Sequence, residues 1–142
     1  IKMDIGIIRL LGARLDKEVK LLKKKYTVKR EDNILQISNP KNKVLNFLEI
    51  VIICPNEYPM VAPICYIANA DIKNCDSSIE NFMFIDKLLP LKWKSTNKLV
   101  SCVKYIYRAL NKEGNFIIKT NKKWTKENIV KSYYDITNKY NL

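Results

Sequence analysis

Histidine is absent from the sequence, and its absence removes several kinds of active site. Without an imidazole the chain cannot form a Ser-His-Asp or Cys-His nucleophile, a histidine metal site or a histidine general base. The four cysteines contain no CxxC pair, so a zinc site made of thiolates is not expected either. We therefore expect neither a metal nor a cofactor.

Long apolar runs, glycine and proline are also scarce. No apolar run approaches the roughly 18 residues that cross a bilayer, so we expect no membrane-spanning segment. Only 3 Gly and 5 Pro occur, which excludes a collagen-like or low-complexity chain. The 142 residues, of which 47% are hydrophobic and 28% charged, suit one folded domain that spans residues 1–142.

Arginine is rare, although the chain is strongly basic. Lys and Arg together number 26 against 14 Asp and Glu, which gives a formal charge of +12. A field of this size attracts phosphates and anionic lipids. Nucleic-acid binders usually add Arg for bidentate contacts, and here Arg occurs only at positions 9, 14, 30 and 108. A nucleic-acid-binding domain is therefore kept only as an alternative, and we expect the lysines to be scattered over the surface.

Three of the four cysteines lie within apolar runs. Cys54, Cys65 and Cys102 are expected to be reduced core residues, which fits a reducing compartment such as the cytoplasm or the nucleus. Cys75 differs, because it lies in a polar stretch where a thiol could be exposed. The chain begins at Ile1 rather than Met, so the lack of a leader says little about targeting.

The periodicity of the apolar residues predicts an α+β fold. The expected helices cover residues 5–25, 97–111 and 126–140, and the expected strands cover residues 26–29, 33–38, 45–54 and 64–68. Short turns join the strands, so the strands should form an antiparallel β-meander. The N-terminal helix and the C-terminal helices should pack on that sheet.

Finer predictions concern particular segments. Residues 45–54 are apolar on both faces, so they should form an inner strand with the second helix packed nearby. Residues 69–95 contain no long periodic element. Ser95 or Thr96 should cap the helix that follows. The short apolar segment 116–118 should dock on the body of the domain.

The most distinctive local string runs from Cys54 to Pro63, between two expected strands. Pro55, Pro59 and Pro63 fix φ and remove backbone donors, so the chain cannot continue the sheet there. Tyr58 can fold its ring over the prolines while its hydroxyl finds a partner. On these residues alone, a stiff turn is the expected result.

Four strings along the chain occur in an order known from one protein family. They are RLDKEV at 14–19, YPMVAP at 58–63, Trp93 ahead of a capped helix, and YYDITNKYNL at 133–142. They resemble, in turn, the RLxKEL string, the YPFKPP turn, the WSP segment and the closing helix of the ubiquitin-conjugating (UBC) family. The resemblance covers nearly the whole chain and implies a UBC-like antiparallel β-meander with the helices packed on it.

The chain departs from the UBC pattern where active members carry their chemistry. The resemblance implies a nucleophilic cysteine shortly before Trp93, but that window holds Met83, Phe84 and Ile85. The family's HPN string, whose Asn helps to stabilise the oxyanion, has no counterpart either. Thioester chemistry needs a thiolate, which these side chains cannot supply. The chain is therefore similar to the inactive branches, the ubiquitin E2 variants and the RWD domains, or to a degenerate conjugating enzyme.

The resemblance implies a non-catalytic protein of a ubiquitin or ubiquitin-like pathway. Its partners would be ubiquitin or a ubiquitin-like protein, and an active conjugating enzyme or ligase. The implied contact residues are Arg14, Lys17, Tyr58, Pro59, Met60, Pro63, Trp93, Lys94 and Ser95. Two alternatives remain open. One is an active conjugating enzyme that uses Cys75 as a displaced nucleophile, and the other is the basic nucleic-acid-binding domain.

Overall fold

The computed structural model describes most of the chain between residue 5 and residue 111. The described residues are 5–67, 69–73, 78–79, 82–84, 93–111 and 116–119, with the single positions 127 and 131. Within these ranges the chain is α+β, as the apolar periodicity predicts. The last expected helix, 126–140, lies outside the described residues except for positions 127 and 131.

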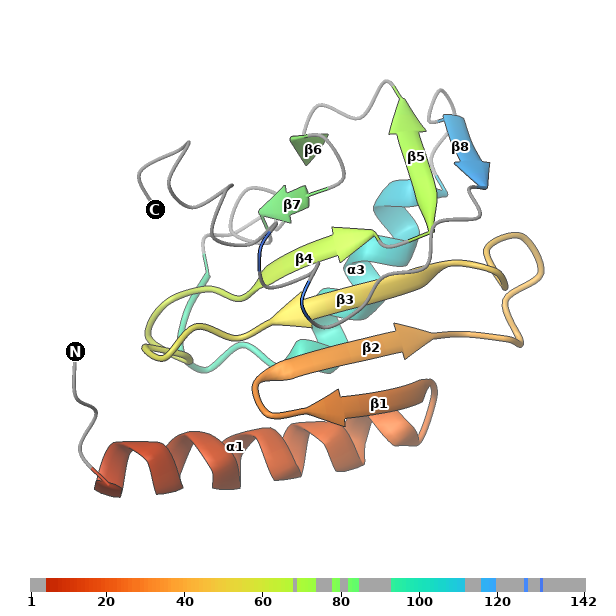
Figure 1. Cartoon of the computed structure of the whole chain (residues 1–142). Helices are drawn as coiled ribbons and strands as arrows, with labels where there is room; N and C mark the ends of the chain where they lie inside the picture. The colour runs from red at the N-terminus through yellow and green to blue at the C-terminus, as the bar shows by residue number, and fades with distance from the viewer. Residues whose placement is uncertain are drawn as a thin grey trace.

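An antiparallel sheet forms the centre of the described part. Its strands lie in the order β1-β2-β3-β4-β7-β6, so the first four form a simple meander (Figure 1). The strands of this sheet are β1 (Thr27–Glu31), β2 (Ile34–Ser38), β3 (Glu49–Ile53), β4 (Ile64–Ile67), β6 (Ser78–Ile79) and β7 (Phe82–Phe84). A separate pair joins β5 (Ala70–Lys73) to β8 (Phe116–Lys119), also antiparallel.

Two helices accompany the sheet. Helix α1 (Ile5–Lys23) packs against β1 and against helix α3 (Leu99–Leu110), and Figure 1 shows α3 behind β3 and β4. Leu15, Val19 and Leu22 recur at helical spacing and are buried, which explains why this face of α1 meets the core. None of the helices in the described ranges is long and apolar enough to cross a bilayer.

Strand β3 lies at the middle of the core. Its residues Ile50, Val51, Ile52 and Ile53 are all buried, so both faces of the strand are covered. This confirms an inner strand for the centre of segment 45–54. Strands β2 and β4 pair with β3 on either side, with Ile34 opposite Ile53 on one and Ile67 opposite Ile50 on the other.

The strand prediction is wrong for residues 45–48, which form a turn. The side-chain oxygen of Asn42 accepts the N–H groups of Val44 and Leu45, at 3.0 and 2.8 Å, and so satisfies the backbone locally. Leu45 and Leu48 are nevertheless buried. They reach the core from a turn, and an apolar run alone cannot distinguish that arrangement from a longer strand.

Other differences concern the ends of elements and short strands. Helix α1 ends two residues before the predicted position, and the strand predicted over 26–29 covers Thr27–Glu31. The segment expected to lack long elements contains β5, β6 and β7, which are too short for a periodic signal. Segment 116–118 lies within β8, which pairs with β5 in the separate two-stranded sheet.

Replacing Ile50 by alanine should test whether the meander buries its core on both faces. We expect Ile50→Ala to lower the free energy of unfolding by about 2–5 kcal/mol, because it opens a cavity in close-packed surroundings. Val44 is 62% exposed, so Val44→Ala should change stability by no more than about 0.5 kcal/mol. Equilibrium urea unfolding measures both, and equal effects would contradict the buried strand.

Candidate functional site

Hydrogen bonds hold the start of the proline-rich turn between β3 and β4 and also join residues within the turn. Asn33 Nδ2 donates to the carbonyl of Cys54 at 2.6 Å, and the Cys54 N–H donates back to the Asn33 carbonyl at 2.9 Å. Within turn 55–63, the N–H of Tyr58 donates to the carbonyl of Pro55 at 2.9 Å, and the N–H of Met60 donates to that of Glu57 at 2.8 Å. The Tyr58–Pro59 peptide bond is cis. The result is a compact turn that does not extend either strand.

Glu18 of α1 is the one charged side chain among the buried polar residues of the described part, with 4% of its surface exposed. One carboxylate oxygen accepts the hydroxyl of Tyr58, and the other accepts the backbone N–H of Leu99 at 2.9 Å. Hydrogen bonds to a carboxylate are among the stronger ones in proteins, and a buried charge needs such partners. Glu18 therefore joins α1 both to the turn and to the first residue of α3.

Arg14 lies one helical turn before Glu18 and reinforces the same junction. Its Nε lies 3.5 Å from the Glu18 carboxylate. Its two terminal nitrogens donate to the carbonyl oxygens of Ser95 and Asn97, both at 2.7 Å. The guanidinium carbon also lies 5.5 Å from the centre of the Tyr58 ring, within the range of a cation–π contact. Arg14 thus compensates the buried carboxylate and holds the segment that leads into α3.

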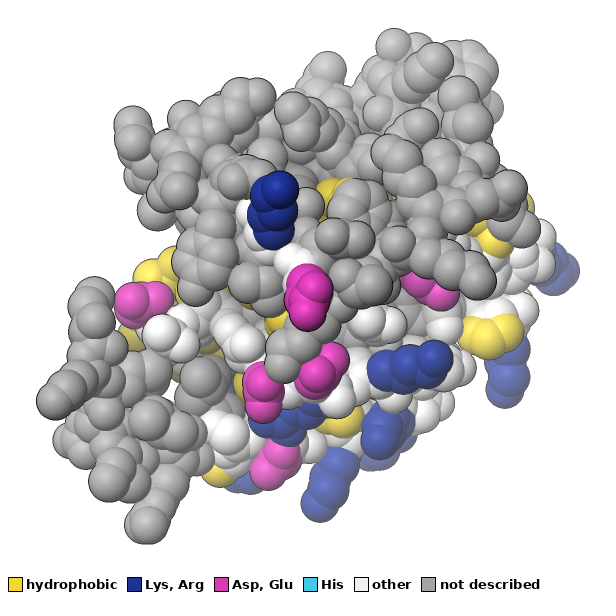
Figure 2. Space-filling model, viewed as in Figure 1, with side chains coloured by type: hydrophobic (Ala, Val, Ile, Leu, Met, Phe, Trp, Pro, Cys, Tyr) yellow, Lys and Arg dark blue, Asp and Glu magenta, His cyan; other side chains and the backbone are white. Residues whose placement is uncertain are grey.

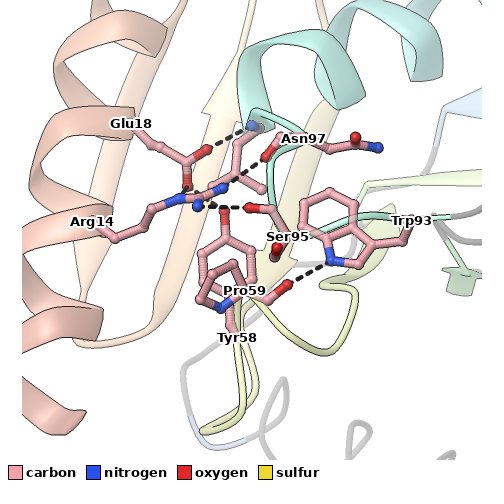
Figure 3. A network of polar contacts seen from close by, with 8 residues as sticks. Arg14, Glu18, Tyr58, Pro59, Trp93, Ser95 and Asn97 are labelled. Carbon is pink, nitrogen blue, oxygen red and sulfur yellow. Dashed lines mark hydrogen bonds and ion pairs between the residues drawn. The ribbon is translucent and has the colours of Figure 1, made fainter.

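Trp93 links the segment before α3 directly to the turn. Its indole N–H donates to the carbonyl of Pro59 at 2.8 Å, and its ring lies 5.9 Å from the Tyr58 ring, tilted by 37°. Helix α1, the turn and the approach to α3 are therefore each bonded to the other two (Figure 3). We call this set of residues the clasp: Arg14, Glu18, Tyr58, Pro59, Trp93, Ser95, Asn97 and Leu99.

The chemistry of the clasp is that of a structural junction. Burial, followed by the hydrogen bond to Glu18, raises the pKa of the Tyr58 hydroxyl well above its usual value. This hydroxyl therefore stays protonated and acts as a donor at neutral pH. No group of three or more metal-ligating side chains occurs within the described ranges. The contacts of the clasp are therefore suited to positioning the segments that they join.

The buried thiols are equally unsuited to chemistry. Cys54, Cys65 and Cys102 are free and buried, as the sequence predicts. Burial is the main cause that raises the pKa of all three thiols, to about 12 for Cys102 and further for the other two. All three thiols therefore stay protonated at neutral pH. Cys75 lies outside the described residues.

The structure brings five of the nine predicted contact residues together in the clasp: Arg14, Tyr58, Pro59, Trp93 and Ser95. Tyr58 is only 3% exposed, so its ring faces the protein interior. Pro63 is buried at the far end of the turn, whereas Lys17 and Lys94 are exposed. Met60 lies at the tip with 79% of its surface exposed, and Val61 beside it is 49% exposed.

Sequence reasoning missed Glu18 and assigned the wrong cap to α3. Neither Ser95 nor Thr96 caps that helix, because its N-cap is Lys98, which makes no side-chain capping bond. Glu18 supplies the acceptor from another helix instead. A signal was present, since Glu18 lies three residues after Leu15 and four before Leu22 on the buried face of α1. A carboxylate at such a position needs a buried partner.

Charged side chains on the face drawn in Figure 2 are mixed in sign. The Lys and Arg side chains lie mainly along the lower and right-hand border, near α1, β1 and the turn after β2, with Asp and Glu among them. Arg30 forms an ion pair with Asp16, which ties β1 to α1. The exposed large hydrophobic residues of the described part are Val44, Met60 and Val61, and only the last two are neighbours.

Comparison with known proteins gives no match for this chain among family models, curated proteins or solved structures. Functional inference therefore depends on the residues and contacts of the chain itself.

A double-mutant cycle should reveal the bond between Tyr58 and Glu18. We expect Tyr58→Phe to lower the free energy of unfolding by about 1.5–3 kcal/mol, because it removes a hydrogen bond to a buried charge. Combined with Glu18→Gln, the effects should be non-additive by about 0.5–3 kcal/mol.

Tyr107 provides the matched control for that cycle. Its hydroxyl is buried and has no hydrogen-bond partner among the described residues, while its ring stacks on Tyr26. Tyr107→Phe should therefore leave stability unchanged or raise it slightly. If both Tyr→Phe substitutions cost the same, the clasp bond does not contribute as described.

Proposed function

We propose that this chain is a non-catalytic protein-binding domain of a ubiquitin or ubiquitin-like pathway, with a UBC-like fold related to the E2 variants and RWD domains. It would bind ubiquitin, a ubiquitin-like protein, or an active conjugating enzyme or ligase. The observation that carries the proposal is an exposed apolar tip, Met60 and Val61, on a turn that the clasp holds to both helices.

The order of elements supports the fold part of the proposal. Helix α1 precedes a four-strand antiparallel meander, the YPMVAP turn joins its third and fourth strands, and Trp93 precedes α3. The UBC resemblance assigns the same places to these strings. The clasp adds a physical reason for their occurring together, because RLDKEV supplies Arg14 and Glu18, and the other two strings supply Tyr58 and Trp93.

The tip supports the binding part of the proposal. Met60 is unbranched and adaptable, and such side chains suit hydrophobic contact with a partner. An exposed apolar pair on a turn that is already ordered loses little conformational freedom on binding. Lys94 is exposed and directly follows Trp93, whose indole N–H donates to Pro59 in the same turn as the tip.

The thiols support the non-catalytic part. Burial leaves Cys54, Cys65 and Cys102 protonated, so none of them is a nucleophile in the folded protein. The window in which the UBC resemblance expects a nucleophile overlaps β7, which pairs with β4 and holds Met83. Cys75 is the thiol on which the alternative, an active conjugating enzyme, depends.

Incubation with activating enzyme and ATP should give no thioester adduct of this chain. The full chain and the variant Cys75→Ser are compared on non-reducing gels, with ubiquitin and with ubiquitin-like modifiers. We expect no reductant-sensitive band in either, because the buried thiols are protonated. A band in the wild type that Cys75→Ser abolishes would establish the enzyme and refute the non-catalytic proposal.

A charge placed at the tip should weaken partner binding. Ubiquitin, ubiquitin-like proteins and a panel of conjugating enzymes are tested against the immobilised chain by biolayer interferometry. We expect Met60→Glu to weaken the interaction at least tenfold, or about 1.4 kcal/mol, since it buries a charge in an apolar contact. Val44→Glu is the matched control, because Val44 is also exposed but lies on another turn.

Both variants should unfold at the wild-type temperature, because both side chains face solvent. Equal loss of binding in the two variants, or no binding by any member of the panel, would contradict the proposed site.

A further inference from the structure

Glu18 gives two distant segments a common acceptor. Tyr58 lies 40 residues and Leu99 lies 81 residues further along the chain, and each donates to a different oxygen of the same carboxylate. A carboxylate is planar and its two oxygens move together, so a rotation that releases one donor also displaces the other. The hydroxyl of Tyr58 and the first N–H of α3 are therefore held by one side-chain conformation.

Burial makes it costly to release either donor alone. Glu18 and Tyr58 are 4% and 3% exposed, and Leu99 is fully buried. A donor that leaves Glu18 without reaching water is a buried unsatisfied polar group, and such groups destabilise strongly. The segments should therefore exchange their partners with water in one opening event, in which the turn and the start of α3 move away from α1 together.

Two further residues, Trp93 and Arg14, strengthen the link between the segments. Trp93 donates directly to the carbonyl of Pro59, which precedes Met60 at the tip. Arg14 binds the carbonyls of Ser95 and Asn97 while it contacts both the Glu18 carboxylate and the Tyr58 ring. The turn and segment 93–99 are therefore joined both directly, through Trp93 and Pro59, and indirectly, through Arg14 and Glu18.

We propose that Glu18 is a positioning residue that couples the Met60–Val61 tip to the segment 93–99, so that the two open as one cooperative unit. Displacement of the tip then also displaces the N-terminus of α3. The coupling does not depend on which partner the tip binds, and it stands or falls separately from the proposed function.

Amide hydrogen exchange of the full chain, followed by NMR, tests the coupling. In Tyr58→Phe the N–H of Leu99 keeps its own acceptor, so a purely local effect leaves its exchange rate unchanged. We expect at least tenfold faster exchange at Leu99, together with Met60 and Val61, whose N–H groups donate to Glu57. The amides of Ile37 and Ile50, within the sheet, should keep their wild-type rates.

Tyr107→Phe is the control variant and should accelerate none of these amides. The proposal is overturned if Tyr58→Phe accelerates Met60 and Val61 alone, or if Leu99 and Ile50 accelerate equally, which would indicate global unfolding. A measurement on the wild type removes any dependence on the variant's folding. In low concentrations of urea, Leu99, Met60 and Val61 should converge on one opening free energy that lies below that of Ile50. Separate values for Leu99 and the tip would equally refute the coupling.

Discussion

Burying a carboxylate between two helices is unfavourable unless its oxygens keep strong partners, and Glu18 meets that requirement through residues from three parts of the chain. Tyr58 comes from the turn, Leu99 from the start of α3, and Arg14 from α1 itself. Removing any of these partners leaves an uncompensated buried group. The positions of the turn and of α3 therefore depend on the same side chain. The position of the exposed tip follows from that of the turn that carries it.

The sheet and the clasp have different physical roles. Strand β3 buries aliphatic side chains of its own on both faces, and this non-directional burial provides cohesion. It does not by itself determine where a proline-rich turn points. Hydrogen bonds supply that direction, because the Tyr58 hydroxyl, the Trp93 indole N–H and the Arg14 guanidinium each require a particular geometry. The apolar core holds the domain together, and the polar junction orients the turn that carries the exposed Met60 and Val61.

Apolar patterning was enough to predict the elements that bury a complete face. Ile50 to Ile53 are apolar on both sides of the strand, and Leu15, Val19 and Leu22 recur at helical spacing, so β3 and α1 were identifiable. Leu45 and Leu48 share the same apolar signal but sit in a turn, because Asn42 satisfies the local backbone. Strands of two or three residues, such as β6 and β7, are too short to show a clear alternation of apolar and polar residues.

The candidate site was predictable in part for a similar reason. The prolines and Tyr58 marked the turn locally, and the RLDKEV string drew attention to Arg14. The cap of α3 was not local, because its acceptor lies 81 residues away on α1. No rule about Ser95 or Thr96 could have revealed that, although a carboxylate on the buried face of α1 indicated that some distant donor was required.

The internal cap on α3 also bears on how this basic chain can interact with anions. The N-terminus of a helix carries a partial positive charge and free N–H groups, and it commonly receives the phosphate of a ligand. In α3, whose first turn contains no acidic residue, the Glu18 carboxylate already occupies that position. A phosphate could enter only by expelling Glu18, which would strip Tyr58 of its acceptor as well. The chain's own carboxylate thus takes the place at this end of α3 where a phosphate from outside the chain would otherwise bind.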